Sequence, residues 1–451
     1  MKKRKGSITV LMSAILAATV LLVCVLADVA GIYFFEQNNA IALNSALKSV
    51  LAGYDETLAA DYGIYGIDTK STANFIAADF NEYYRANLKS VGNQKPVISE
   101  CGLNGFGSVI SGASVEASIL KHMRYRSPIY LAEGLIRNIN LEGTVVKTAD
   151  FSGRVKSLAD SLGDMKDKGQ IIGDLAELLN IGKILLYLQQ IKTAIRNDNV
   201  EINPEWLITP ETGSAAAAND TDVFSEMVEN QAPPDIAESA GLIERLSTAL
   251  LSFRDTMYIA SYVNEKFNCY DGSGLSKSAG RRFFGNGEIE YILFGQNSKA
   301  VNVSKTMDRI YLIRFVINTC DAFEEYKEYD PRLQLLMSVI SGAVGASDEI
   351  VRLYSGGEIS LTPGFGFLKL DYRDHLMMML VMELAENRQG VIDRIRNLIQ
   401  VNMIQDNADF KLKDISSAIS CEVVVSMDTY FLRFAGFKKY ITRKQIYKGY
   451  I

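Results

Sequence analysis

The longest pattern of hydrophobic positions in the chain is an uncharged apolar run from Ile8 to Ala27. Its twenty residues match the length that an α-helix needs to cross the hydrocarbon core of a bilayer. Four cationic residues stand among the first five positions, before this run. Because an excess of Lys and Arg marks the cytoplasmic side of a span, we expect a single-pass cell-membrane protein with a cytoplasmic N-terminus and an extracellular C-terminal domain.

Beyond this run the pattern becomes amphipathic without a break. Apolar residues recur at steps of three and four positions, which is the spacing of one helix face. These residues are Leu43, Leu47, Val50, Leu51, Tyr54, Leu58 and Tyr62. No proline occurs before Pro96, so no proline ends the helix at the membrane surface. At about 1.5 Å per residue, a helix from Ile8 to Asp61 is about 80 Å long, and we expect its outer half to pack against a globular domain.

Alternation with a period of two marks two regions as strands. Between residues 95 and 120, KPVISECGL and GSVISGASVEASI predict two strands joined by the turn GLNGFG. At the other end of the chain, SCEVVVSMDTYFLRF and KKYITRKQIYKGY predict a hairpin with Gly436 between its strands. We expect the early strands (95–120) and the C-terminal strands (421–450) to form one small antiparallel sheet near the base of the N-terminal helix.

Most of the remaining sequence has helical periodicity. Helices are expected at 72–88, 127–138, 151–197 with a break at Gly182, 242–267, 306–329, 331–344, and after Asp371 through 392–403. The segment 288–294 predicts either a short strand or a buried helical turn. The predicted fold class is α+β, mainly helical, with a long N-terminal transmembrane or spike helix, a helical body and a small antiparallel sheet.

The segment 207–240 differs from its surroundings in composition. It is rich in Ala, Asp, Glu, Ser and Pro and poor in large apolar residues, so we expect a flexible linker. The predicted organisation along the chain is then as follows: a cytoplasmic basic leader (1–7), a transmembrane helix (8–35), an extracytoplasmic helix with an α+β region (36–206), the linker (207–240), and a helical region ending in a β-hairpin (241–451).

Charge and cysteine content narrow the function classes. The net charge of -6 and the pI near 5.3 give no electrostatic footprint for nucleic acid. One cysteine, Cys24, lies in the apolar run, and no CxxC motif of a zinc ribbon or thioredoxin-type site occurs. The remaining four can form disulfides in three pairings or stay as buried thiols, and both alternatives are open. They are Cys101, Cys269, Cys320 and Cys421.

The sequence gives little support to an enzyme. His122 and His375 are the two histidines of the chain, and neither lies in an HExxH, GxSxG or P-loop motif. One polar cluster combines Asp371, Asp374 and His375. It is either a metal or general-base site or, more simply, a capped, buried helix whose histidine is hydrogen-bonded. We expect no enzymatic activity, no cofactor and no metal.

Three interpretations fit the first thirty residues. A secretory signal could be cut after Ala27, although its apolar region usually has about 7–15 residues. An uncleaved anchor fits the length, with Tyr33, Phe34 and Phe35 as an aromatic belt at the interface. A prepilin-type leader is a short basic peptide that ends in Gly, followed by a small residue and a long helix.

The N-terminal sequence KKRKGSITVLMSAILAATVLLVCVLADVAG resembles the start of TadE/TadG-like pilus-assembly proteins of tight-adherence (Tad) systems. The resemblance implies processing between Gly6 and Ser7. The chain has Leu11 where many prepilins carry Glu. Three further segments are similar to an uncharacterised Gram-positive family that shares a GSITV-type N-terminus and is often encoded beside Tad components. They are SVLAGYDETLAADYGIYGID, EYILFGQNS and LDYRDHLMMMLVMELAENRQGVIDRI.

This resemblance implies a membrane-anchored, extracytoplasmic structural component of a Tad-type pilus or secretion apparatus, either pilin-like or an assembly platform. The implied partners are the membrane and other pilus or pseudopilin subunits, in a homo- or hetero-oligomer through the N-terminal helix. Small residues in that helix permit close helix contacts. They are Ala14, Ala17, Ala18 and Ala27. The alternatives are an anchored adhesin or wall-binding protein, with a basic C-terminal strand face available for an anionic polymer, and an extracellular hydrolase.

Overall fold

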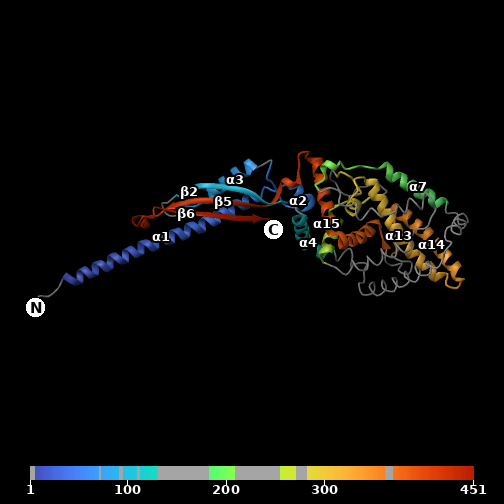
Figure 1. Ribbon diagram of the computed structural model, residues 1–451, viewed down its shortest axis with the longest axis horizontal. Coiled ribbons are helices and arrows are strands. Elements are labelled where there is room, and N and C mark those ends of the chain that lie inside the picture. Colours follow the sequence, from blue (N-terminus) through green and yellow to red (C-terminus); the bar gives the residue numbers. More distant parts are fainter. Residues whose placement is uncertain are drawn as a thin grey trace. The chain divides into compact units, whose positions relative to one another are not determined.

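The computed structural model describes residues 6–70, 73–90, 95–108, 112–130, 182–208, 254–270, 282–360 and 369–450 (Figure 1). The chain forms two compact units. The first unit combines both chain ends, Met1–Ser114 and Lys411–Ile451, and the second comprises Val115–Phe410. The C-terminal hairpin therefore belongs to the unit of the N-terminal helix, and not to the helical region that precedes it in sequence.

The first unit is built around one long helix, α1 (Gly6–Leu51). Its second half buries Phe35, Leu43 and Leu47 completely. Helix α3 (Ala73–Asn87) adds Phe80 and Tyr84 to the same core. Alternate residues of one strand complete it from one face of a sheet: Ile419, Cys421, Val423, Val425 and Met427. The amphipathic half of α1 is thus a core helix, as its pattern predicts. It ends at Leu51, and a separate short helix, α2 (Glu56–Tyr62), follows.

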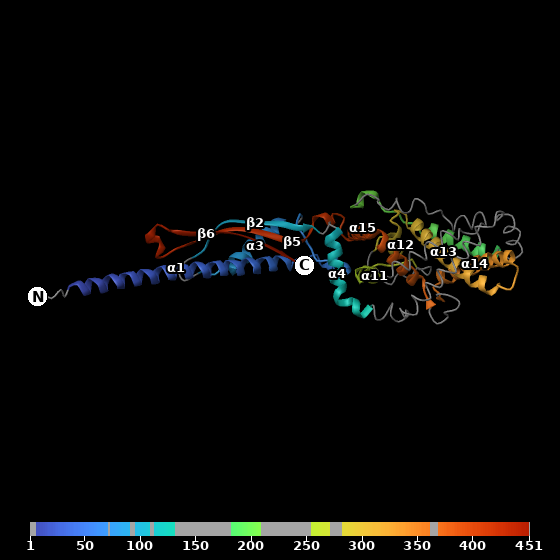
Figure 2. The ribbon, with the colours of Figure 1, turned by 60° about the horizontal axis from the view of Figure 1, so that its bottom comes forward.

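The sheet of this unit is antiparallel, and β5 (Ile415–Asp428) is its central strand. The early strand β2 (Val97–Ser108) and the last strand β6 (Lys439–Gly449) both pair along β5, and the two-residue β1 (Ile67–Asp68) pairs with its start. Figure 2 shows β2, β5 and β6 lying side by side above α1. The expected meeting of early and C-terminal strands is confirmed.

The expectation of two early strands is wrong. Residues 102–106, taken as a turn, continue β2 and pair with residues 422–418 of β5. Residues 112–119 of the segment taken as the second strand lie in helix α4 (Gly112–Tyr130). Val115, Ile119 and Met123 are spaced by four residues and fully buried, so a helical period overlaps the alternation and prevails. Because α4 also runs through Pro128, a helix start at 127 is wrong as well.

Between β5 and β6 the chain forms a compact tip that contains the 3-10 turn η5 (Leu432–Ala435). Gly436 follows with φ of 94°, a left-handed conformation that glycine adopts without steric cost. The hairpin predicted from the last thirty residues is confirmed, and Gly436 is its turning residue.

The second unit is helical in its described residues. Its longest elements are α13 (Lys299–Glu325), α14 (Pro331–Tyr354) and α15 (Tyr372–Asp406), and α13 and α14 pack closely on each other. Helix α15 kinks at Asn387. Its shorter elements are α7 (Gly182–Asn197), η2 (Pro204–Trp206), α11 (Arg254–Lys266), α12 (Glu288–Phe294), β3 (Ile359–Ser360) and β4 (Lys369–Leu370). The 3-10 turn η4 (Leu412–Asp414), which follows α15, belongs to the first unit.

The predicted fold class, α+β and mainly helical, is confirmed. Of the two alternatives for 288–294, the structure shows the helical one. All seven residues of α12 are buried. The predicted linker 207–240 lies outside the described residues except for Leu207 and Ile208, as do residues 131–181 of the predicted helices. All five cysteines are described, and no disulfide joins any of them.

Candidate functional site

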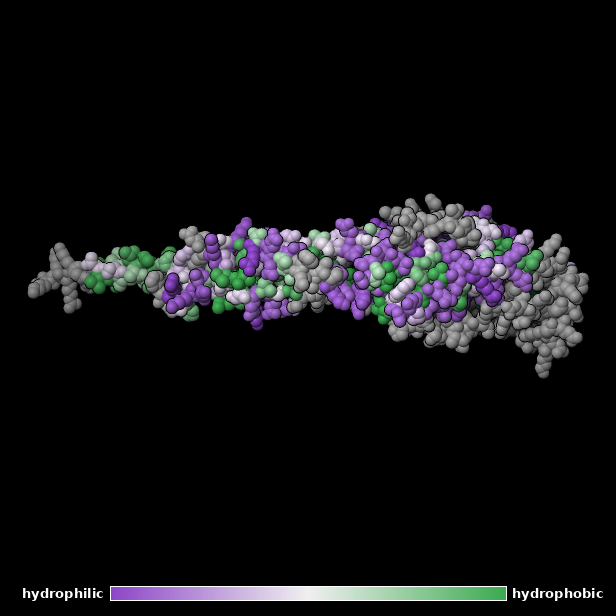
Figure 3. All heavy atoms as spheres, turned by 90° about the horizontal axis from the view of Figure 1, so that it is seen from above, coloured by the Kyte–Doolittle hydropathy of each residue, from purple (hydrophilic) through white to green (hydrophobic). Residues whose placement is uncertain are grey.

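The apolar run of α1 forms a continuous hydrophobic surface. Twelve large apolar side chains between Ile8 and Val29 are each more than half exposed. In Figure 3 these residues form the hydrophobic region nearest the N-terminus. By length and composition this helix can cross a membrane, and a secretory signal has the same features. An apolar surface of this kind needs an apolar environment, since exposing it to water is unfavourable.

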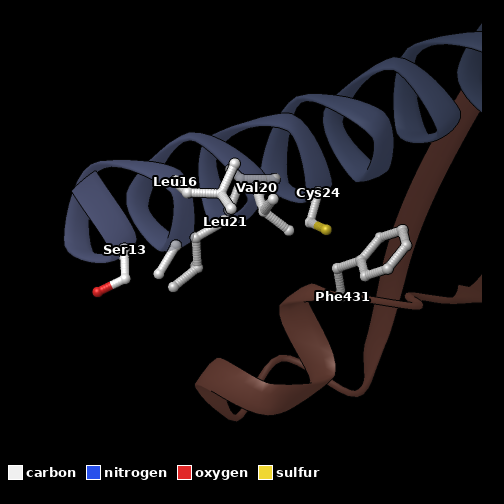
Figure 4. Close-up of a pocket in the computed structure, with 8 residues that line it drawn as sticks. Ser13, Leu16, Val20, Leu21, Cys24 and Phe431 are labelled. Carbon is white, nitrogen blue, oxygen red and sulfur yellow. The ribbon is translucent and has the colours of Figure 1, made fainter. Parts of the chain in front are cut away.

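A shallow groove of about 560 Å³ follows one side of this run (Figure 4). Its walls are Ser13, Leu16, Ala17, Val20, Leu21, Cys24, Val25 and Phe431. Seven of these belong to α1, whereas Phe431 comes from the tip between β5 and β6 and lies opposite Cys24. The C-terminal hairpin therefore reaches the apolar run itself, and not only the amphipathic half of the helix.

Asp28 fixes the tip at this position. It is the first charged residue after the apolar run and is only 6% exposed. Its carboxylate accepts hydrogen bonds from the backbone N–H groups of residues 430, 431 and 432, at distances between 2.5 and 3.1 Å. These amides open the 3-10 turn η5 and have no partner within the turn, so a carboxylate there satisfies several donors at once. Sequence reasoning missed this role, although a lone acid at the end of an apolar run was a signal.

Further polar contacts hold α1 to the sheet and to α3 beyond Asp28. Glu36 accepts a hydrogen bond from the Tyr440 hydroxyl, and its backbone carbonyl accepts one from Lys444 Nζ at 3.1 Å. Asn39 accepts one from the Tyr84 hydroxyl at 2.7 Å. These contacts give the helix a defined rotation and register against the strands.

The aromatic belt expected on α1 is two residues, not three. Tyr33 and Phe34 are about three-fifths exposed, whereas Phe35 is fully buried and packs edge-on against Tyr440. Phe35 faces the sheet because it lies on the same helix face as the core residues Ala42 and Ala46. The predicted processing residues Gly6 and Ser7 are the first two residues of α1.

The polar cluster at the start of α15 is brought together as its spacing suggests. The Asp371 carboxylate caps the helix by accepting a hydrogen bond from the backbone N–H of Asp374 at 2.8 Å, and the Asp374 carboxylate accepts one from the backbone N–H of Asp371 at 3.0 Å. Burial raises the pKa of Asp374 to about 6. His375 Nδ1 lies 2.7 Å from the Asp371 carbonyl oxygen, and burial lowers the pKa of this ring to about 4. The neutral, buried imidazole of His375 beside a capping box fits the start of a stable helix better than it fits a general-base site.

The other histidine lies in a charged cluster. His122 Nε2 is 3.8 Å from Glu265, which also contacts Arg126 and Lys266. Burial and then the charges of Lys266 and Arg126 lower the pKa of His122. Among the described residues no three His, Cys, Asp or Glu side chains are grouped as a metal site.

A second buried network, around α12, was not predicted. Glu288 accepts hydrogen bonds from the backbone N–H of Asn268 and from the Asn402 amide, at 2.8 and 2.7 Å. Glu290 accepts bonds from the backbone N–H of Tyr270 and from the Tyr372 hydroxyl, both at 2.8 Å. Both carboxylates are fully buried, and together they hold the chain at 268–270 in place. The alternation of Glu and apolar residues in EIEYILF was the signal, and it left a short strand and a buried helical turn open.

Glu290 is expected to make the second unit less stable as the pH rises. Burial raises its pKa from 4.5 to about 7, so the folded state holds the proton more tightly than the unfolded chain. The contribution of protonated Glu290 to the free energy of unfolding is complete below pH 4.5 and is lost as the pH rises through 7. We expect Glu290→Gln to remove this decline. Urea unfolding across this window, followed by fluorescence of the single tryptophan, Trp206, measures it.

All other groups titrate alike in the wild type and in Glu290→Gln, so the difference between their midpoints isolates Glu290. His375 has the opposite trend, because its lowered pKa costs stability as the pH falls from 6.5 towards 4. Parallel midpoints for the two proteins from pH 4.5 to 7 would contradict the prediction.

Comparison with known proteins gives one match. A family of unknown function (DUF5702) matches residues 207–355, about a third of the chain. In the described residues this region contains α11, α12, α13 and α14. No curated protein and no solved structure shows significant similarity to the chain. The match thus lies in the second unit and assigns no activity to it.

Proposed function

We propose that this chain is a membrane-anchored, extracytoplasmic structural component of a Tad-type pilus or secretion apparatus. The observation that carries the proposal is the division of α1 into two halves. The first half exposes its apolar side chains all round, and the second half is the core helix of a folded unit. A helix of this kind couples a folded domain rigidly to whatever surrounds its apolar half.

The orientation follows from charge. The residues before Ile8 are basic, and the positive-inside rule directs such a segment to the cytoplasm. The helix then carries the sheet and the second unit to the outside of the cell membrane. In a signal peptide cut after Ala27, Asp28 would become the new N-terminus, whereas in an anchor it stays within a continuous helix, as it is in α1.

The apolar half of α1 also supports assembly with other pilus or pseudopilin subunits, in a homo- or hetero-oligomer. The small residues Ser13, Ala17 and Cys24 are among those that line its groove, together with larger apolar neighbours. Small residues allow helix backbones to approach closely in a membrane, where van der Waals contact drives association. The resemblance of the N-terminus to TadE/TadG-like proteins identifies the kind of assembly we propose.

The adhesin or wall-binding alternative receives less support from the basic strand β6. Arg443 lies 3.2 Å from Glu422 and 3.5 Å from Glu100, and Lys444 donates to the carbonyl of Glu36. Two of the basic residues proposed to meet an anionic polymer are therefore engaged within their own unit. The hydrolase alternative has no catalytic arrangement among the described residues.

The decisive experiment determines the mature N-terminus by mass spectrometry of protein extracted from its native membrane. We expect Ser7 as the first residue. The basic peptide ends in Gly6, and the small residue Ser7 and the long helix follow it, as in a prepilin-type leader. A Gly6→Val variant should keep Met1, since the bulky side chain blocks the processing site. Gly31→Ala is the matched control, because a Cβ at Gly31 meets nothing within 4 Å.

Each outcome decides between the interpretations. Ser7 at the N-terminus, together with recovery of other pilus subunits after mild crosslinking, supports the proposal. An N-terminus at Asp28 means a secreted domain and overturns it. Met1 in the wild type, without co-recovered subunits, leaves an anchor outside any pilus and overturns the assembly part.

A further inference from the structure

The tip between β5 and β6 exposes an unusual set of side chains. We define the tip as residues 429–438. Tyr430, Phe431 and Phe437 are 50%, 43% and 66% exposed, although large aromatic residues are normally buried in a folded domain. Exposed aromatic residues gathered on one short loop mark a contact surface.

This tip is held in a fixed conformation. Besides the three amides bound by Asp28, the backbone N–H of Phe437 donates to the Leu432 carbonyl at 3.1 Å, and that of Thr429 donates to the Lys438 carbonyl at 3.2 Å. The Thr429 hydroxyl also donates to the Phe437 carbonyl. The aromatic side chains are therefore presented on a rigid turn, so exposing them does not depend on a fluctuating loop.

The position of the tip along α1 sets its depth in the bilayer. Phe431 lies against Cys24 and Val25, which are inside the apolar run that ends at Ala27 (Figure 4). At about 1.5 Å per residue, Cys24 is about 5 Å inside the end of that run. If the run crosses the membrane, the ring of Phe431 lies at the boundary between acyl chains and headgroups, where aromatic residues are enriched.

The charge of the tip fits the same boundary. Arg433 and Lys438 in the tip, and Lys439 directly after it, are neighbours of the aromatic residues in sequence and are all exposed. Basic side chains that flank interfacial aromatic residues reach towards lipid phosphates and are attracted to an anionic membrane surface. Two acids are near: Asp28, which is occupied by backbone amides, and the exposed Asp428, which lies opposite Lys439 in the sheet, so the basic residues are in excess. An aromatic and cationic tip is the composition of an interfacial membrane contact.

From these observations we infer a second membrane contact, in which Tyr430, Phe431 and Phe437 insert at the acyl–headgroup boundary and the three basic residues bind the phosphates of anionic phospholipids. This inference rests on the proposed anchor, because the apolar run of α1 sets the height of the tip. It adds a function to the hairpin: a helix alone can tilt and rotate in the bilayer, whereas a helix with a laterally attached tip has one orientation. The folded domain is thereby held at a fixed angle to the membrane surface.

The test places single tryptophans in the full chain. In a Trp206→Phe background, Phe431→Trp reports the tip, Leu22→Trp reports the apolar run, and Tyr447→Trp reports a distant exposed site on β6. The protein is reconstituted into vesicles of phosphatidylcholine and phosphatidylglycerol, with bromine on the acyl chains of part of the lipid. Bromine quenches tryptophan at contact range. Tyr447 is a fair negative control, because it is 55% exposed and eight residues beyond Lys439 along the strand.

We expect Leu22→Trp and Phe431→Trp to be quenched several-fold more than Tyr447→Trp. Quenching of Leu22→Trp with Phe431→Trp at the level of Tyr447→Trp would overturn the second contact and leave the anchor intact. A blue-shifted but unquenched Phe431→Trp would mean that protein, such as a second copy, covers the tip, and would also overturn it. If Leu22→Trp itself escapes quenching, both the anchor and the tip contact fail.

Discussion

Replacing Asp28 with Ala is expected to release the tip of the β5–β6 hairpin while the rest of the first unit stays folded. The carboxylate is the acceptor of three backbone N–H groups, and hydrogen bonds to a charged partner contribute about 1.5–3 kcal/mol each in favourable cases. Without it these amides lie beside an apolar helix with no acceptor. We expect local opening to become easier by about 3 kcal/mol, roughly a hundredfold in opening equilibrium.

Amide hydrogen exchange measures this effect at the residues concerned. The amides of Tyr430, Phe431 and Leu432 should lose protection in Asp28→Ala, whereas those in the middle of β5 should keep it. Asp28→Asn retains one carbonyl acceptor, so we expect an intermediate loss. Asp428→Ala is the matched control, because Asp428 is an exposed carboxylate at the adjacent end of β5. Unchanged exchange at the tip in Asp28→Ala would show that the carboxylate does not hold it.

The global features of the first unit could be predicted because its signals are long and consistent. The apolar run, the amphipathic continuation of α1 and the alternation in β5 each extend over many residues, so one interrupted position does not change the pattern. The sharing of one antiparallel sheet by strands from the two ends of the chain was predicted from their alternation, whereas their order around β5 was not. The pairing register and the role of Asp28 could not follow, because they depend on contacts between residues four hundred positions apart.

The errors have a common cause in short segments. In GSVISGASVEASI the same apolar residues satisfy a period of two and a period of four, and local sequence alone cannot choose. Tertiary packing chooses, since Val115, Ile119 and Met123 can all be buried on one face of a helix. In α12 the choice stayed open for the same reason, because the pattern of Glu288 and Glu290 fits both a short strand and a buried helical turn. Both carboxylates are buried, because backbone amides and side chains of distant segments satisfy them.

The candidate site divides in the same way. The capping box of Asp371 and Asp374 was predictable because capping is a local interaction within four residues. The tip between β5 and β6 was not, although its parts are visible in the sequence as an acid after the apolar run and as aromatic residues around Gly436. Only the fold brings Phe431 to Cys24. A site assembled from the two ends of a chain becomes recognisable once the register between helix and hairpin is known.

The second large effect is expected at the close crossing of α13 and α14. A Cβ added to Gly342 would lie 1.9 Å from Thr319 Oγ1 and 2.9 Å from the Thr319 backbone nitrogen. The hydroxyl can rotate away only by giving up its bond to the Phe315 carbonyl, and the backbone nitrogen cannot move without its helix. Gly342→Ala must therefore push the two helices apart. The crossing includes the paired Arg314 and Glu349, whose guanidinium and carboxylate are joined by two bonds of 2.7 Å.

We expect Gly342→Ala to destabilise the second unit by about 2 kcal/mol or more, since overpacking costs about 1–3 kcal/mol and strain on a buried ion pair adds to it. The gain of about 1 kcal/mol in helix propensity from Gly to Ala offsets only part of this cost. Urea unfolding followed by Trp206 fluorescence measures the change. Trp206 belongs to the second unit and packs edge-on against Phe283 at 5.7 Å, so its signal follows that unit.

Gly345→Ala is the matched control, one helical turn along on the same helix. Its added Cβ would lie 3.1 Å from the amide nitrogen of Asn318, which donates to Glu349 at 2.7 Å and can keep that bond while the side chain shifts by a few tenths of an ångström. Here the gain in helix propensity and the crowding nearly cancel, so we expect a change within about 0.5 kcal/mol. Thr319→Ala removes the atom closest to the new methyl group, and a double-mutant cycle with Gly342→Ala should therefore show a favourable coupling. A destabilisation by Gly342→Ala as small as that by Gly345→Ala, with no coupling to Thr319, would contradict the prediction. It would mean that the close approach of the two helices does not determine the stability of the unit.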